Sequence, residues 1–103
     1  MEYTVPSGVR IGHIHLKVSD IEKSLSFYRD ILGFEVTERI GTQAAFVSAG
    51  GYHHHIGLNT WQTRGAPQAN PSHVGLYHTA LLYPTRRDLA VILQRLIEKK
   101  YPL

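Results

Sequence analysis

The sequence has no cysteine among its 103 residues, which excludes both a disulfide framework and a thiolate zinc site. Any metal ligand must therefore come from histidine, carboxylate or water. Long apolar runs are missing too. No stretch approaches the roughly 20 residues of a membrane span, and the N-terminus lacks the basic-then-apolar pattern of a signal peptide. We expect a soluble, cytoplasmic protein without membrane contact.

Charge of one sign is not concentrated anywhere in the chain. Eleven Lys and Arg against eight Asp and Glu give a net charge of +3, and the densest basic pairs are Arg86-Arg87 and Lys99-Lys100, at the two ends of a predicted helix. Because nucleic-acid-binding domains gather basic residues on one face, we expect no nucleic-acid partner. A hydrophobic content of 43% suffices for one core, so residues 1–103 are predicted to form a single domain.

Patterning over residues 9–61 predicts a βαβββ module. Apolar and polar residues alternate over 9–18, which is typical of a strand. Ser19 followed by Glu22 is a capping-box signature, and apolar residues then recur at helical spacing until Gly33. Turns around glycine separate three further predicted strands, at residues 34–39, 43–49 and 52–61.

The same pattern begins again after a linker predicted at residues 62–75, which is rich in Gly, Pro, Asn and Ser. Residues 76–83 resemble a strand, Pro84-Thr85 with Asp88 can start a helix, and an apolar stripe follows. An internal repeat is therefore predicted, with residues 76–103 as the start of a second module. Either this sequence is a piece of a longer chain, or short chains complete their sheets with one another. The fold class is α+β, with a mixed, curled sheet and helices on its outer face.

Histidine is the one residue type in excess, with seven copies. Side chains alternate along a strand, so His13 and His15 share the face opposite the apolar residues, and the repeat places His78 on the equivalent face. Alternation sends His54 away from its neighbours. If the next apolar residues of that strand face the helices, the open face also receives His53, His55, Gly57 and Asn59.

Three strands would then direct imidazoles into one concavity, a donor set suited to iron, manganese, zinc or nickel. A site of two histidines and one carboxylate would leave positions open for substrate and O₂. The competing interpretation is that each histidine is half-buried and hydrogen-bonded to its neighbours. His53 and His55 could equally orient a substrate, donate protons or fix ligand tautomers.

Two segments resemble a known family. They run from Gly12-His13-Ile14-His15-Leu16 through Ser24-Leu25-Ser26-Phe27-Tyr28 to Leu32-Gly33-Phe34, and from Gly51-Tyr52 to Trp61. The first resembles the opening of glyoxalase, bleomycin-resistance and extradiol dioxygenase proteins, the vicinal oxygen chelate superfamily. The second is similar to the N-terminal domain of catechol 2,3-dioxygenase-like proteins. This resemblance implies paired βαβββ modules whose sheets curl around a metal.

The resemblance places the first-strand metal ligands at His13 and His78. The ligand position on the fourth strand, a Glu in glyoxalase I, falls on Gly57, which favours the two-histidine pattern of the dioxygenases. The third dioxygenase ligand, a Glu on the last strand of the second module, would lie beyond Leu103. The implied metal is iron or manganese, ahead of zinc or nickel. Candidate residues lining the substrate cup are His15, His53, His55, Asn59 and Tyr77.

Two functions follow from this resemblance. The first is metal-dependent ring opening of an aromatic diol, in a parent protein to which this chain contributes part of the active site. The second is a metal-free structural or small-ligand-binding module of the bleomycin-resistance kind, without catalysis of its own. Glyoxalase-type isomerisation is a third, weaker alternative, because Gly57 offers no carboxylate. A strand and helix without partner strands also predict a homodimer, by edge pairing or strand exchange.

Overall fold

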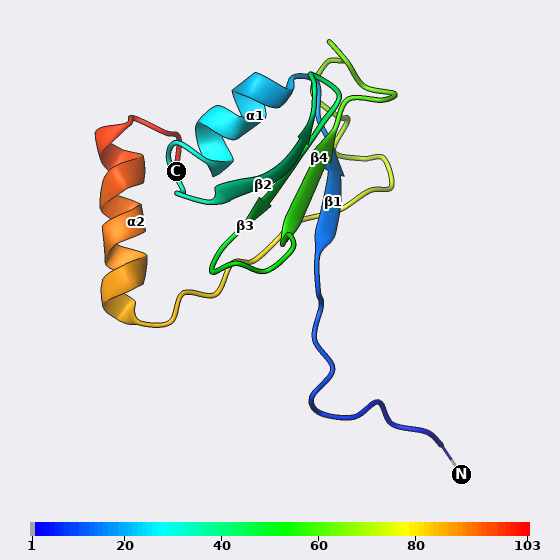
Figure 1. The fold of residues 1–103 in the computed structure, drawn as a ribbon, viewed down its shortest axis with the longest axis vertical. Coiled ribbons are helices and arrows are strands. Elements are labelled where there is room, and N and C mark those ends of the chain that lie inside the picture. The colour runs from blue at the N-terminus through cyan, green and yellow to red at the C-terminus, as the bar shows by residue number, and fades with distance from the viewer. Residues whose placement is uncertain (1) are drawn as a thin grey trace.

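A computed structural model describes residues 2–103 and shows one mixed sheet with two helices (Figure 1). The sheet order is β1-β4-β3-β2, in which β1 and β4 are parallel and the other neighbours antiparallel. The predicted α+β class and βαβββ order are confirmed. The elements, in chain order, are β1 (Ile14–Lys17), α1 (Ile21–Tyr28), β2 (Glu35–Ile40), β3 (Ala44–Ser48), β4 (Ile56–Asn59) and α2 (Arg86–Glu98).

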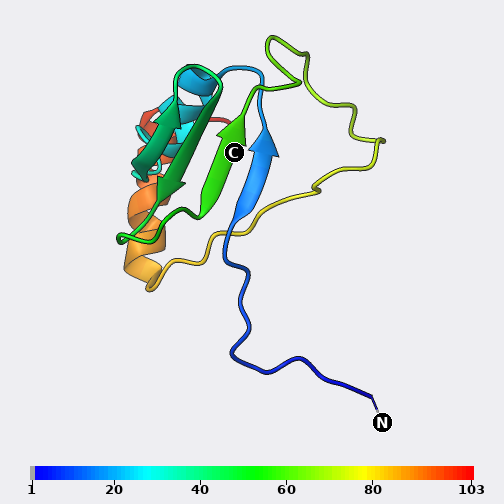
Figure 2. The same cartoon turned by 45° about the vertical axis from the view of Figure 1, so that its right-hand side comes forward.

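The helix α1 covers one face of the sheet and leaves the other open (Figure 2). Ile21 and Leu25, on the covered side of α1, are 2% and 0% exposed. They pack on alternate residues of three strands, because every second side chain of a strand points to the same face of the sheet. These partners are Ala45, Val47, Ile56 and Leu58, with Ile14 and Leu16 at the margin.

The helix α1 begins one residue later than the capping box predicts. Asp20, not Ser19, is the N-cap, and its Oδ1 accepts a hydrogen bond from the Lys23 backbone N–H at 3.0 Å. The helix is also shorter than predicted: it ends at Tyr28, and a turn leads to Gly33, whose φ of +86° favours glycine.

The strands β1 and β4 are shorter than the predicted segments 9–18 and 52–61. The first pair in their register is Ile14 with Ile56. Residues before Ile14 have no neighbouring strand to bond with, and residues 2–12 run away from the sheet as an extended arm (Figure 1). Strand length is thus set by the partner, not by β-propensity alone.

The helix α2 confirms the predicted start at Thr85, whose Oγ1 accepts from the Asp88 backbone N–H at 3.1 Å. It stands beside α1. The Arg95 guanidinium donates to the backbone carbonyls of Ile31 and Asp30, both at 2.8 Å. An apolar cleft of about 300 Å³ separates Ile92 and Leu96 of α2 from α1 and the sheet.

The predicted strand at 76–83 is absent: within the described chain these residues form no strand and pair with none. They belong to a long connection that runs from β4 to α2 (Figure 2). The physical reason is the lack of a neighbour, since a strand needs a hydrogen-bonding partner along its edge. No helix in residues 2–103 is long and apolar enough to cross a membrane.

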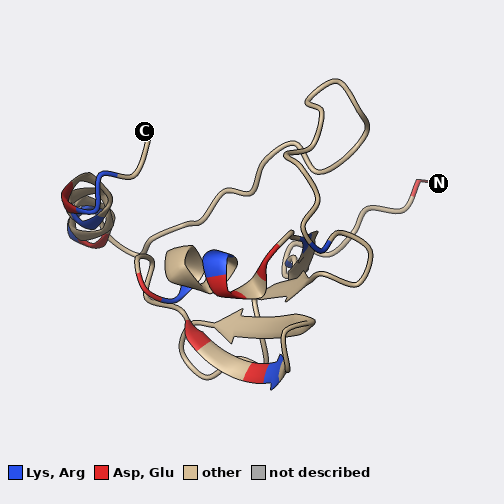
Figure 3. Cartoon of the chain, turned by 90° about the horizontal axis from the view of Figure 1, so that it is seen from above, with Lys and Arg blue, Asp and Glu red and all other residues tan. Residues whose placement is uncertain are grey.

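Lys, Arg, Asp and Glu are interspersed over the molecule, and both signs occur on α2 and on β2 (Figure 3). Within β2, Arg39 forms an ion pair with Glu22 of α1. This mixture gives no basic face of the kind that binds a phosphate backbone. That the protein has no nucleic-acid partner stays a prediction.

Candidate functional site

The open face of the sheet carries one row of residues in register across all four strands. His15 of β1 pairs with Gly57 of β4, Gly57 with Phe46 of β3, and Phe46 with Glu38 of β2. Because this row lies opposite the α1 face, its side chains project from the open face of the sheet. The side chain of His15 lies on this face, while its role in a substrate cup stays a prediction.

Gly57 is a position where a side chain has no room. A Cβ at this position would lie 2.7 Å from Nδ1 of His15 and 3.2 Å from Cε1 of Phe46. The rings of His15 and Phe46 meet over the glycine, edge to face, with centroids 5.9 Å apart. The space of a fourth-strand carboxylate is therefore filled by an imidazole and a phenyl ring.

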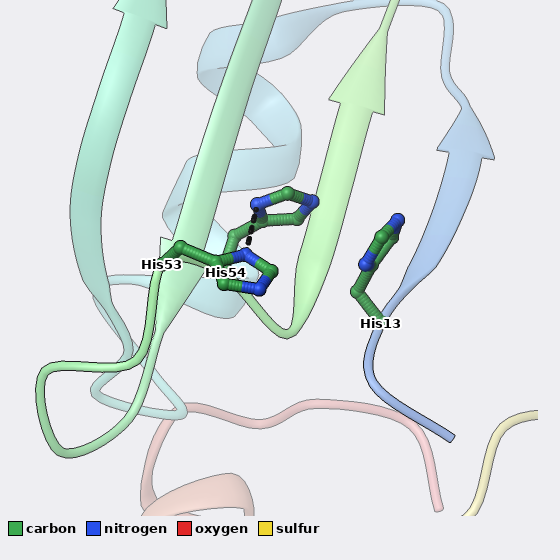
Figure 4. Close-up of side chains that lie close together, drawn as sticks. All are labelled: His13, His53 and His54. Carbon is green, nitrogen blue, oxygen red and sulfur yellow. Dashed lines mark hydrogen bonds between the residues drawn. The ribbon is translucent and has the colours of Figure 1, made fainter. Parts of the chain in front are cut away.

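Three imidazoles gather beside this row: His13 at the entry to β1, and His53 and His54 before β4 (Figure 4). Each offers a nitrogen, and these nitrogens lie within 4.8 Å of one another. Nδ1 of His53 and Nδ1 of His54 are 3.0 Å apart, and the rings of His13 and His54 have centroids 4.3 Å apart. Among the residues described, these three side chains are the group that lies close enough together to hold one metal ion.

The prediction that His54 points away from the site is wrong. It assumed a strand over 52–61, but β4 begins at Ile56 and the three histidines lie in the loop before it. Strand alternation does not apply in a loop. His54 turns toward His13, and the ring of Phe46 lies against it with centroids 5.0 Å apart.

The pKa of His54 lies below its ordinary value. Burial is the largest cause, followed by the charges that His13, His53 and His15 would carry, while the Glu38 carboxylate acts in the opposite direction. Both leading causes disfavour the imidazolium. These causes favour the neutral imidazole of His54 over its charged form.

The imidazole of His55 lies against the end of β3, away from the rings of His53 and His54. Its Nδ1 accepts from the Ala49 backbone N–H at 3.2 Å and lies 3.4 Å from the Ser48 hydroxyl. Its ring also packs on Tyr52, with centroids 4.6 Å apart. These contacts tie the loop to the end of β3, and they hold His55 apart from the three-imidazole group.

Asn59 is in register with Lys17 on the open side but is only 4% exposed. Its Oδ1 accepts from the Trp61 backbone N–H at 3.2 Å, so the amide helps place the residue that follows it. Trp61 brings its indole to within 5.9 Å of the His15 ring, centroid to centroid. Trp61 thus adds a further aromatic ring beside His15.

Tyr77 and His78 lie in the connection between β4 and α2, and both are exposed. Their rings contact each other, with centroids 5.2 Å apart. The strand that was expected to aim His78 at His13 is not formed. The assignment of His13 and His78 as a ligand pair stays a prediction, as does the role of Tyr77.

Sequence reasoning missed Phe46, Glu38 and Trp61. Phe46 and Glu38 could have been placed by aligning the antiparallel β2–β3 hairpin, but the register shifts between Val36 and Glu38. Such a bulge leaves no clear signature in this sequence. Trp61 follows β4, where its direction is set by the Asn59 amide rather than by any periodicity.

A second hollow of about 380 Å³ lies at the N-terminus of α1, away from the histidines. Most of its lining side chains are charged or carry a hydroxyl, and several of them pair with one another. Arg39 bonds Glu22, and Arg64 donates to the Thr42 hydroxyl at 2.9 Å. Among the described residues no histidine lines this hollow, so it is separate from the three-imidazole group.

Comparison with known proteins agrees with this geometry. Residues 10–103 match the family model described as Glyoxalase/Bleomycin resistance protein/Dioxygenase superfamily. A catechol-2,3-dioxygenase of Bacillus subtilis is 42% identical over 101 residues, covering 97% of this chain and 35% of the relative. A biphenyl-2,3-diol 1,2-dioxygenase of Rhodococcus globerulus is 31% identical over 80 residues, covering 78% of this chain and 42% of the relative.

Among solved structures, the lactoylglutathione lyase of Agrobacterium tumefaciens matches with a TM-score of 0.67 and 21% identity, covering 96% of this chain and 75% of that chain. At this identity the match speaks for the fold alone. The chain spans 35% of the length of the Bacillus relative and 42% of the Rhodococcus relative.

Proposed function

Because the chain belongs to the Glyoxalase/Bleomycin resistance protein/Dioxygenase superfamily, we propose that it forms part of a cytoplasmic, metal-dependent extradiol dioxygenase that opens a catechol-type ring. The observation that supports this most is the gathering of imidazoles and aromatic rings on the open face of one sheet. The printed names of two relatives, both dioxygenases, favour the same reaction class. The activity belongs to a protein for which this chain supplies one part.

The donors of the cup suit a transition metal. Imidazole nitrogen is a good ligand for iron, manganese, zinc and nickel, and the crowding at Gly57 disfavours a carboxylate from β4. In the proposal His13 and His78 are ligands, with a carboxylate from outside this sequence as the third. Iron or manganese is proposed ahead of zinc or nickel. When bound, such an ion would supply Lewis-acid chemistry toward two adjacent substrate oxygens.

The residues of this chain would bind and orient the substrate. Phe46 and Trp61, on either side of the His15 ring, offer flat apolar surface to an aromatic substrate. His15 and His53 can donate hydrogen bonds to the oxygens of the substrate. Holding the substrate in one orientation toward O₂ lowers the entropic part of the activation barrier. His55, Asn59 and Tyr77 are proposed to line the cup around this core.

The test measures oxygen uptake with catechol by the full-length protein that contains this chain. His13→Ala is expected to lower both metal content and turnover at least about tenfold, as loss of a metal ligand does. His78→Ala should act in the same direction, while His73→Ala, on the same connection, serves as the matched control. Unchanged metal content and turnover in the His13→Ala, His78→Ala double variant would falsify the ligand assignment.

A metal-free binding module is the second candidate, and the aromatic rings of Phe46 and Trp61 beside His15 favour it, because they can bind an aromatic ligand without an ion. Trp61 is the only tryptophan and lines the cup, so its fluorescence reports binding directly. If this candidate holds, catechol quenches Trp61 fluorescence equally with and without a chelator. Quenching that disappears with the chelator supports the metal-dependent proposal instead.

We also propose a homodimer formed through β1. This strand is an edge of the sheet, since its only neighbour is β4 in the described chain. The Ile14 N–H bonds inward to the His55 carbonyl, so the N–H of His15 points outward. An unpaired edge favours association. Sedimentation should show a dimer at micromolar concentration, and a stable monomer would refute it.

A further inference from the structure

We infer that His13, His53 and His54 form a metal site that this chain builds by itself, taking a divalent ion of the zinc type and leaving one coordination position open. The inference rests on the proposed function in one respect, the metal chemistry of the cup. It differs in the ligand set, because His78 and the outside carboxylate have no part in it.

The spacing of the loop imidazoles fits a shared ion. Two nitrogens bound to one Zn²⁺ at about 2.0–2.1 Å lie about 2.9–3.4 Å apart, over bond angles from octahedral to tetrahedral. Nδ1 of His53 and Nδ1 of His54 are 3.0 Å apart, within this range. A single proton bridges them without a metal. Once that proton is lost, an ion bound to both nitrogens would lie to one side of the line that joins them, toward His13.

His13 can complete the set. Its nitrogen is within 4.8 Å of the other two, and its side chain is exposed at the entry to β1 (Figure 4). An exposed imidazole changes its side-chain torsions at little cost, so it can close the remaining distance without movement of the strand. The ion would be attached to two segments, the loop before β4 and the start of β1.

Neighbouring rings hold two of the ligands in place. Tyr52 packs on the His53 ring with centroids 4.0 Å apart, and Phe46 contacts the His54 ring at 5.0 Å. The turn that feeds the loop uses Gly50 and Gly51, whose φ angles of +70° and +80° other residues rarely adopt. Preorganised ligands lose less entropy on binding an ion.

The donor set selects the class of ion. Three imidazoles without a carboxylate suit Zn²⁺, Ni²⁺ or Cu²⁺, and do not suit Ca²⁺ or Mg²⁺, which prefer oxygen. Three protein ligands plus an open position is the arrangement of catalytic rather than structural zinc. Glu38 is in register with Phe46, whose ring contacts His54, so its negative charge would favour a cation on this face of the sheet.

The experiment titrates Zn²⁺ alone into the tag-free 103-residue chain by calorimetry, because a histidine tag would itself bind the ion. We expect one ion per chain. His13→Ala, His53→Ala and His54→Ala should each weaken the dissociation constant at least about tenfold. His73→Ala is the matched control and should change it less than about twofold, and His78→Ala separates this site from the ligand pair of the proposed function.

Circular dichroism shows whether each variant still folds. If His54→Ala disturbs the circular dichroism spectrum, His54→Gln replaces it, and imidazole nitrogen shifts in the wild-type chain identify which rings take the ion. Loss of binding in His78→Ala with normal binding in His53→Ala would overturn the inference and support the ligand pair of the proposed function. No binding to the chain, with metal in the full-length dioxygenase, would overturn the inference alone.

Discussion

The first sixty residues and the last forty contain similar sequence patterns but differ in structure. The first βαβββ module buries a continuous core beneath α1. After β4 the chain forms one helix and leaves Val74, Tyr77 and Leu82 at least 94% exposed. The radius of gyration is 15.7 Å, against about 13 Å for a compact chain of this length. A pattern becomes a strand only where another strand accepts its hydrogen bonds.

The largest expected effect is a difference in stability between two leucine variants, one on each helix. Leu25→Ala removes a fully buried side chain of α1 and should lower the free energy of unfolding by about 2–5 kcal/mol. Leu93→Ala on α2, where the side chain is 45% exposed, should change it by less than about 1 kcal/mol. Urea unfolding followed by circular dichroism measures both. Equal losses would show that α2 shares the core of the first module.

Gly57→Ala tests how tightly the open face is packed. The new Cβ would meet the His15 ring, and overpacking should cost about 1–3 kcal/mol. His15→Ala in the same chain removes the nearest contact, so the double variant should recover most of the loss. Thermal unfolding of the two single variants and the double variant gives the coupling. Purely additive effects would contradict the contact.

The two helix caps compare the halves at a finer level. Asp20→Ala removes the N-cap of α1 and should lower global stability by about 1 kcal/mol. Thr85→Ala removes the equivalent bond in α2, but we expect it to raise amide hydrogen exchange in α2 without moving the global transition. Exchange measured by mass spectrometry resolves the two helices. A global shift from Thr85→Ala would argue that α2 unfolds with the sheet.

The smallest effect is a pH dependence at the contact between the halves. Burial, and then the charge of Tyr101, raise the pKa of Tyr28. The folded state therefore holds the phenolic proton more tightly than the unfolded chain, so stability is complete below the ordinary pKa of about 10 and falls as pH rises through the higher folded value. Tyr28→Phe should remove this fall, as measured by unfolding at pH 8 to 11. An unchanged alkaline slope would assign it to other groups.

Much of the fold could be predicted because binary patterning and turn residues decide element type locally. The alternation over Ile14 and Leu16, and the cap at Thr85, are examples. What could not be predicted depends on neighbours distant in sequence. The start of β4 at Ile56 is set by its pairing with β1 and β3, which leaves His54 in a loop where its side chain points toward His13. Residues 76–83 stay unpaired because no strand lies beside them.

Arg95 has a mechanical consequence for the second half. Its guanidinium donates hydrogen bonds to the Asp30 and Ile31 carbonyls and so connects α2 to the turn that follows α1. Hydrogen bonds from a charged donor contribute about 1.5–3 kcal/mol each, and Ile92 is the buried side chain of α2. With so few contacts, we expect α2 to separate from this turn more readily than the strands of the first module separate from one another.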